Sequence, residues 1–205
     1  MKTLVIATKN SAKFTEISRA INRLERDKVR LLSLNDFPRV EEPVETGKTF
    51  KDNAFLKAKH YAELTGAPCL SDDAGLSIDI LNGEPGVRSR RWPGHEASDQ
   101  ELIDFTLQKL KGVPRKKRSA KLQLCLCFYD PQTKIALFEE AATGGYIAEK
   151  PLSNFTPGYP FRAVFIVDRF HKYYQRLTPE EHELVNHRFL AATKLAKKII
   201  PLLLE

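Results

Sequence analysis

The first half of the chain alternates short apolar runs with stretches of helical periodicity. The apolar runs predict buried strands at 3–7, 29–33, 68–73 and 76–80. Helical spacing places four apolar residues on one face of a helix over 10–23, namely Phe14, Ile17, Ile21 and Leu24. A second helix is predicted over 49–64. Strands that alternate with helices in this way are typical of an α/β fold.

Two capping patterns predict helices in the second half. Ser98 and Glu101 have the spacing of a capping box, which opens a helix that runs to about Lys111. Thr178 is followed by proline and two glutamates, the same pattern with proline in the first helical position. It predicts one long closing helix that ends near Pro201.

The remaining strands complete a single domain. Alternating residues over 121–129 and the apolar run that follows over 135–141 predict a hairpin, and 163–167 is one more strand. We therefore predict an α/β fold over residues 1–205, with a mixed, twisted sheet flanked by helices on both faces.

Composition places the chain among ordinary globular proteins. The longest apolar runs fall far below the roughly 20 residues that a membrane span needs, and the apolar run after Met1 is too short for a signal peptide. We expect a cytoplasmic protein without a membrane segment. Cys69, Cys125 and Cys127 lack metal-ligand spacing, so buried reduced thiols are predicted.

A formal net charge of +7 suits a polyanionic partner, which could be a nucleotide, a nucleic acid or an anionic membrane. The densest basic run, 115–118, is interpreted as a solvated loop. The other basic residues are spread along the chain without the interleaved aromatic residues of a single-strand binding groove. Nucleic acid is therefore a less favoured partner than a nucleotide.

The junction of the first predicted strand and helix is a candidate phosphate site. A helix N-terminus offers unpaired backbone N–H groups and the positive end of the helix dipole. The polar residues there are Thr8, Lys9, Asn10, Ser11 and Lys13. The lysines add charge and the others add hydrogen bonds, although a simple capped helix would have a similar composition.

Three carboxylates form a candidate metal site. Asp72 and Asp73 end an apolar strand, where functional residues often lie in open α/β sheets. Because adjacent residues on a strand point in opposite directions, one aspartate can serve as metal ligand or base while the other anchors the loop. Mg²⁺ takes one or two carboxylates plus substrate oxygens and water, so Glu45 with Asp73 would suffice.

Two helical positions add candidate ligand contacts. Lys57 lies one turn beyond Asn53, so both can reach the same edge of a site. In the closing helix, His187 and Arg188 could donate to purine carbonyl oxygens, with His182 one turn earlier. Ordinary surface positions on a helix are the alternative for both groups.

The order and spacing of these motifs carry more information than any one of them. The chain resembles the inosine/xanthosine triphosphate pyrophosphatase family, which hydrolyses non-canonical purine triphosphates. The matching stretches are ATKNSAK at 7–13, ETGKTFKDNAFLKA at 45–58, the segment 65–94, RSAKL at 118–122 and NHR at 186–188. They follow the family order over most of the chain.

The resemblance implies a homodimeric, elongated α/β enzyme of two lobes with a nucleotide cleft between them. It implies Mg²⁺ held by Glu45 and Asp73, with Asp73 placed to activate the attacking water. Thr8 to Lys13 and Lys57 would bind the triphosphate. Such chemistry requires mainly positioning and charge neutralisation, which Mg²⁺ and lysines supply.

Departures from the family pattern concern the base. Ala74 replaces the serine of the family's Asp-Asp-Ser-Gly, and Asn186 replaces the serine of its Ser-His-Arg. One turn before Asn186, His182 stands where the family usually has a lysine. In the base-binding loop Arg162 replaces an aspartate, whereas Tyr159 keeps an aromatic face for stacking. Phe161 belongs to the same predicted loop.

Four functions are compatible with these features. The leading one is release of pyrophosphate from ITP, dITP or XTP, which would clean the nucleotide pool. A pyrophosphatase for another or a modified nucleotide is suggested by Arg162 and Ala74. A nucleotide-binding regulator without turnover would have no need of a water-activating Asp73, and a nucleic-acid-binding module would leave the acidic residues unexplained.

Overall fold

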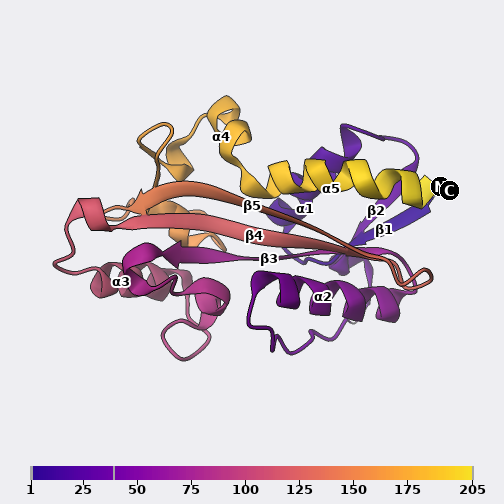
Figure 1. The fold of residues 1–205 in the computed structure, drawn as a ribbon, viewed down its shortest axis with the longest axis horizontal. Helices are drawn as coiled ribbons and strands as arrows, with labels where there is room; N and C mark the ends of the chain where they lie inside the picture. The colour runs from indigo at the N-terminus through magenta and orange to yellow at the C-terminus, as the bar shows by residue number, and fades with distance from the viewer. Residues whose placement is uncertain (1, 39, 205) are drawn as a thin grey trace. The chain divides into compact units, whose positions relative to one another are not determined.

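The structure, a computed structural model, describes residues 2–38 and 40–204 (Figure 1). Its strands are β1 (Lys2–Ile6), β2 (Val29–Ser33), β3 (Cys69–Ile78), β4 (Ser119–Tyr129), β5 (Ala136–Ile147), β6 (Phe165–Val167) and β7 (Lys172–Tyr173). Its α-helices are α1 (Ser11–Asn22), α2 (Phe50–Thr65), α3 (Asp99–Lys109), α4 (Pro179–Val185) and α5 (His187–Leu204). Short 3₁₀ helices are η1 (Leu34–Asp36), η2 (Asp79–Leu81), η3 (Gly86–Arg91), η4 (Arg115–Lys117), η5 (Pro160–Ala163) and η6 (Tyr174–Arg176).

The strands form one mixed sheet. Its seven strands follow the order β2-β1-β3-β4-β5-β6-β7. β1 is parallel to β2 and to β3, whereas β6 is antiparallel to both β5 and β7. The predicted α/β fold with a mixed sheet is confirmed. Within the described residues, no helix combines the length and apolar character that crossing a bilayer requires.

The chain divides into two compact units. Unit 1 comprises 1–73, 124–141 and 187–205, and unit 2 comprises 74–123 and 142–186. Each unit has a hydrophobic core of its own. In unit 1, Ala54, Ala58 and Tyr61 of α2 pack with residues of β1, β3 and β4. In unit 2, Leu102 and Ile103 of α3 pack with the apolar residues of η5 and β6.

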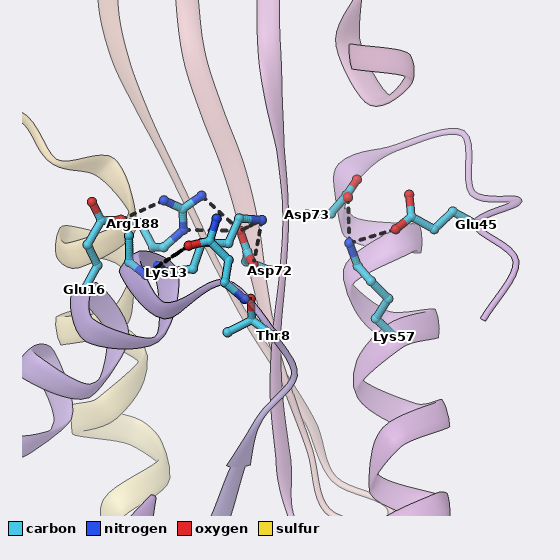
Figure 2. Close-up of polar contacts among 10 residues, drawn as sticks. Thr8, Lys13, Glu16, Glu45, Lys57, Asp72, Asp73 and Arg188 are labelled. Carbon is cyan, nitrogen blue, oxygen red and sulfur yellow. Dashed lines mark hydrogen bonds and ion pairs between the residues drawn. The ribbon is translucent and has the colours of Figure 1, made fainter. Parts of the chain in front are cut away.

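Unit 1 begins with two crossovers that run in opposite directions. β1 leads through α1 to β2 at the edge of the sheet, and β2 returns through α2 to β3 on the far side of β1. Since such crossovers are right-handed, α1 and α2 must lie on opposite faces of the sheet. Figures 1 and 2 show α1, with α5 beside it, on one side of β3 and α2 on the other. A topological switch point therefore lies between β1 and β3.

The predicted helix starts are confirmed. Thr49, Ser98 and Thr178 each accept a hydrogen bond from the third residue of the helix that follows, and the acidic side chain at that position bonds back to the cap. These reciprocal bonds satisfy backbone donors that the first turn would otherwise leave unpaired. α2 ends at Gly66, whose φ of 67° is the left-handed conformation that favours glycine.

Three sequence predictions were wrong in detail. The stretches 68–73 and 76–80 form the single strand β3, in which Ala74 and Gly75 stay extended. Leu24 lies beyond the end of α1 and is 38% exposed. The long closing helix is broken at Asn186, because the Thr143 hydroxyl donates to the Val185 carbonyl and so replaces a helical N–H.

The last helix also continues past the predicted stop. α5 runs through Pro201 to Leu204, so the proline lies in its final turn. Pro201 has no N–H to donate to the carbonyl four residues earlier, but only three residues of the helix follow it, so few later helical hydrogen bonds depend on this turn.

The three cysteines are reduced, as predicted. Cys69, Cys125 and Cys127 are all buried and form no disulfide. Burial raises the pKa of Cys125 and of Cys127 to about 12, so both remain thiols at neutral pH.

The interpretation of 115–118 as a solvated loop was wrong for Arg118, which is buried and holds together three segments of unit 2. Its guanidinium is buried, and each nitrogen donates to a backbone carbonyl at 2.9 Å: Nε to Val113, Nη1 to Ala148 and Nη2 to Leu110. A planar cation with a fixed fork of donors suits three carbonyls that converge from different directions.

We predict that Arg118→Met lowers the free energy of unfolding by about 3 kcal/mol, because three buried carbonyls lose a charged donor. Urea denaturation measures the change. Lys116→Met, two residues away and exposed, is the control and should shift stability by less than about 0.5 kcal/mol. Equal effects of the two substitutions would contradict the prediction.

Candidate functional site

The candidate site begins where β1 ends beside β3. The parallel pairing of these strands runs through Val5 with Cys69 and Ile6 with Leu70, and the Ala7 N–H donates to the Leu70 carbonyl at 2.8 Å. The chain then leaves β1 and enters α1, while β3 continues to Asp72 and Asp73. Ligands in open α/β sheets bind at this kind of position, beyond the carboxyl ends of strands at a switch point.

The turn from β1 into α1 is held by its own side chains. Thr8 Oγ1 accepts the Asn10 N–H at 3.1 Å, and Asn10 Oδ1 accepts the N–H groups of Ala12 and Lys13 at 2.9 and 3.2 Å. Asn10 is thus the N-cap of α1. Ser11 is exposed at the helix start.

Lys9 points to a different partner from Lys13. Its Nζ lies 3.0 Å from Glu42 Oε1, and both side chains are largely exposed. Lys13, by contrast, reaches β3. Of the two lysines predicted for this turn, the structure therefore brings only Lys13 to the aspartates.

Asp72 faces α1 and α5 and pairs with two cations (Figure 2). Lys13 Nζ lies 3.2 Å from Asp72 Oδ2, and Arg188 donates to the same oxygen from Nε at 3.2 Å and from Nη2 at 3.1 Å. Arg188 Nη1 also donates to Glu16 Oε2 at 2.7 Å. The side chains of Asp72 and Arg188 are 3% and 4% exposed, so this ion pair is buried.

Burial and charge oppose each other in this cluster. Burial disfavours the Asp72 anion, but the charges of Lys13 and Arg188 outweigh it and hold the pKa of Asp72 well below its usual range. Burial lowers the pKa of Lys13, and the nearby Asp72 only partly offsets this. Asp72 is consequently a permanent anion at neutral pH.

Asp73 faces α2, on the opposite side of β3 (Figure 2). Lys57 Nζ lies 2.8 Å from Asp73 Oδ1 and 3.2 Å from Glu45 Oε1. Asn53 Nδ2 donates to Asp73 Oδ2 at 3.3 Å. The opposite orientations predicted for the two adjacent aspartates are confirmed, and each has its own partners.

The electrostatics of the Asp73 face differ from those of Asp72. Burial raises the pKa of Asp73, and the single ammonium of Lys57 does not fully offset it. Burial acts to lower the pKa of Lys57, but the negative charges of Asp73, Asp72 and Glu45 raise it overall. The Asp73 face thus combines a more basic carboxylate with a firmly protonated lysine.

Glu45 and Asp73 are the residues that could hold a divalent cation. The ammonium of Lys57 contacts both carboxylates, so both can approach a single positive charge. Across 2–38 and 40–204 no group of three or more His, Cys, Asp or Glu side chains could hold a metal. Two carboxylates are nevertheless enough for Mg²⁺ when phosphate oxygens and water complete its octahedron.

A second group of predicted residues lies in unit 2. The Arg162 guanidinium carbon lies 3.8 Å from the centroid of the Tyr159 ring and 4.9 Å from that of Tyr174. The His182 ring meets Tyr174 edge-on at 5.2 Å. Arg162 therefore stacks on the tyrosine that the sequence assigned to base stacking.

Other residues that were predicted to contact the base lie in the protein interior or in regular secondary structure. Phe161 is 9% exposed and packs in the core of unit 2. His187 is buried at the start of α5, and Ala74 continues β3 after Asp73. Arg188 lies with Asp72, so the structure groups it with the predicted phosphate side.

Glu16 was missed in the sequence, and Asn53 was placed at the same edge as Lys57 without a role of its own. Glu16 lies three residues after Lys13 on α1, a spacing that places both on one helical face. Asn53 is a polar residue beside Ala54 in the buried part of α2. A buried amide needs hydrogen-bond partners, so its position was the available signal.

We predict that Asp72→Asn lowers the free energy of unfolding at pH 7 by about 3 kcal/mol, because Arg188 and Lys13 lose a buried counter-charge. In the unfolded chain the pKa of Asp72 is about 3.9, the usual value for an aspartate. Since folding depresses its pKa, its stabilisation is complete above that pH and is lost as the pH falls.

Unfolding of both proteins from pH 7 to pH 3 tests this. The stability difference should shrink as the pH falls below about 4. A difference that stays constant over this range would contradict the assigned role of Asp72.

Solved structures with this fold come from several bacteria. A HAM1 protein from Coxiella burnetii superposes with a TM-score of 0.82 at 32% identity, covering 98% of this chain and 100% of that one. A nucleoside-triphosphatase, or dITP/XTP pyrophosphatase, from Mycobacterium abscessus gives a TM-score of 0.75 at 34% identity, covering 94% and 98%.

Sequence relatives match at similar identity along nearly the whole chain. A dITP/XTP pyrophosphatase of Bacillus cereus is 36% identical over 200 residues, which is 97% of this chain and 95% of the relative. One from Geobacillus kaustophilus is 38% identical over 195 residues, covering 95% and 93%. The profile of the Ham1 family matches residues 4–198. This chain belongs to the Ham1 family.

Proposed function

We propose that this protein is a Mg²⁺-dependent enzyme that hydrolyses non-canonical purine nucleoside triphosphates such as ITP, dITP and XTP to the monophosphate and pyrophosphate. The names of its relatives support the substrate class. The observation that carries the proposal is the convergence of Glu45 and Asp73 on one cationic position beside the end of β1. A cytoplasmic location and a homodimer belong to the same proposal.

Glu45 and Asp73 would hold the magnesium ion, with phosphate oxygens of the nucleotide as further ligands. When bound, the ion would neutralise charge on the phosphates and acidify nearby water. Asp73 lies in β3, so the sheet fixes the position of its carboxylate. Glu45 lies in a loop, so the position of its carboxylate depends on the conformation of that loop. Lys57 between them limits their repulsion.

Asp73 is proposed to accept the proton of the attacking water. The water oxygen would bond to the α-phosphorus, the bond between that phosphorus and the bridging oxygen would break, and pyrophosphate would leave. A carboxylate whose pKa is raised by burial accepts a proton more readily than an exposed one. Asp72 cannot share this role, because its charge is committed to Lys13 and Arg188.

The triphosphate would be bound by the start of α1 together with Lys13 and Lys57. The first turn of α1 supplies the positive end of its dipole, with the N–H groups of Ala12 and Lys13 oriented by the Asn10 cap. The lysines supply charge from the two faces of β3. Phosphoryl transfer depends mainly on such positioning and neutralisation.

We predict that Asp73→Asn lowers kcat at least about a hundredfold, because the water loses its general base. Pyrophosphate and orthophosphate release would be measured with Mg²⁺ and, separately, ITP, XTP, dITP, GTP, ATP and TTP. Asp27→Asn, an exposed aspartate of unit 1, is the matched control and should retain activity.

Wild-type release of pyrophosphate that requires Mg²⁺ and Asp73 would support the proposal. Release of orthophosphate alone would indicate a different reaction. No release of either product from any of the triphosphates, in a folded sample, would favour a nucleotide-binding protein without turnover or a modified substrate.

A second candidate function, with altered base selectivity, is favoured by the surroundings of Arg162. The resembling family carries an aspartate there, a pure acceptor, whereas arginine is a pure donor. Stacking on Tyr159 and Tyr174 restrains the guanidinium plane. A fixed donor beside the base would favour bases that present a hydrogen-bond acceptor at that edge over bases that present an N–H group there.

We predict that Arg162→Asp changes the ratio of kcat/KM for ITP over GTP by about tenfold, since one directed base contact is worth about 1–3 kcal/mol. Steady-state kinetics over the same six triphosphates measure the ratio. Arg169→Asp, an exposed charge reversal in unit 2, is the control. Strict wild-type preference for inosine and xanthosine nucleotides, unchanged by Arg162→Asp, would rule out a role in selectivity.

A further inference from the structure

Asn53 connects Asp73 with the loop that carries Glu45, the two proposed metal-binding carboxylates. It is 2% exposed and belongs to the second turn of α2, four residues before Lys57 and on the same helical face. Gly47 of the Glu45 loop lies on one side of the amide and Asp73 on the other.

The hydrogen bonds of Asn53 assign the orientation of its amide. The Gly47 N–H donates to Asn53 Oδ1 at 2.8 Å, and Asn53 Nδ2 donates to Asp73 Oδ2 at 3.3 Å. A backbone N–H can only donate and an ionised carboxylate can only accept, so the reversed amide would lose both bonds. The one side chain therefore connects a loop backbone to a strand carboxylate.

Gly47 brings the loop close enough for this connection. A Cβ at this position would lie 2.4 Å from Asn53 Oδ1, 2.7 Å from Asp52 Cβ and 2.8 Å from the Asn53 backbone nitrogen. Any larger residue would thus push the loop away from the start of α2. Glu45 is two residues earlier in the same loop, outside regular structure.

The two oxygens of Asp73 have separate partners. Oδ2 accepts from Asn53, and Oδ1 accepts from Lys57, which also contacts Glu45. Two anchored oxygens fix the rotation of the carboxylate about its Cβ–Cγ bond. The same amide fixes the loop that carries the second carboxylate.

We propose that Asn53 is a positioning residue that sets the spacing of Glu45 and Asp73 for the divalent cation. The inference rests on the proposed function. Residues that orient metal ligands by hydrogen bonding to them typically contribute about 10- to 100-fold to metal affinity or activity. Lys57 neutralises the pair and Asn53 orients it.

Mn²⁺ binding without nucleotide tests the role of Asn53 directly. Titration followed by electron paramagnetic resonance would compare the wild type with Asn53→Ala and with Asn53→Leu, which fills the side-chain volume. We expect the Mn²⁺ dissociation constant to rise about tenfold or more in both variants. In turnover assays the Mg²⁺ requirement should rise by a similar factor.

Thr106→Val is the matched control for a lost buried hydrogen bond. Thr106 is fully buried in α3 of unit 2, and its hydroxyl donates to the Leu102 carbonyl at 2.6 Å. This variant should have a lowered melting temperature and wild-type Mn²⁺ affinity. It separates general loss of stability from loss of ligand orientation.

A double-mutant cycle distinguishes action through Asp73 from a separate effect. In an Asp73→Asn background, Asn53→Ala should change Mn²⁺ affinity less than about twofold, since coupled residues are non-additive. Additive effects would overturn the proposal, as would wild-type Mn²⁺ affinity in Asn53→Ala or in Asn53→Leu. Mn²⁺ binding is scored even if no triphosphate is hydrolysed, so failure of this inference and failure of the proposed function are distinguishable.

Discussion

The alternation of side chains along β3 is the constraint on which the site depends. Consecutive residues of a strand point to opposite faces, so Asp72 and Asp73 must be separated by the sheet itself. The two crossovers place α1 and α2 on those same faces. Each aspartate therefore meets a different helix, and each helix supplies one lysine: Lys13 from α1 and Lys57 from α2.

The balance of charge gives the two aspartates different properties. Asp72 is buried against two cations, which keep its pKa low and its charge permanent. Asp73 shares its one lysine with Glu45, and burial raises its pKa. A carboxylate with two cations stabilises structure, whereas one that competes with a second carboxylate for a single cation is able to accept another positive charge. The different roles that we propose for Asp72 and Asp73 follow from this difference in the number of cations beside each.

Local signals in the sequence predicted most of the helices and strands, but not the contacts at the site between residues far apart in the sequence. The capping boxes at Ser98 and Thr178 each define a helix start within a few residues, so they required no tertiary information. The break at Asn186 depends on the Thr143 hydroxyl, which lies 42 residues before its acceptor Val185 along the chain, and no local pattern encodes it. The pairing of Arg188 with Asp72 spans 116 residues and was likewise outside the reach of spacing arguments.

The division into units separates the proposed metal and phosphate residues from the positions that depart from the family pattern. Unit 1 contains the chain up to Asp73, the stretch 124–141 and the chain from His187 onward, so the proposed metal and phosphate residues all belong to it. The departures all lie in unit 2: Ala74, Arg162, His182 and Asn186. Unit 2 has its own core, and Tyr174, which stacks with both Arg162 and His182, is fully buried in it. Substitutions there can therefore change the surroundings of Arg162 without disturbing the carboxylates and lysines of unit 1, because the two units have separate cores. For the proposed function, this separation is a physical reason why base selectivity could change while the proposed metal and phosphate residues stay the same.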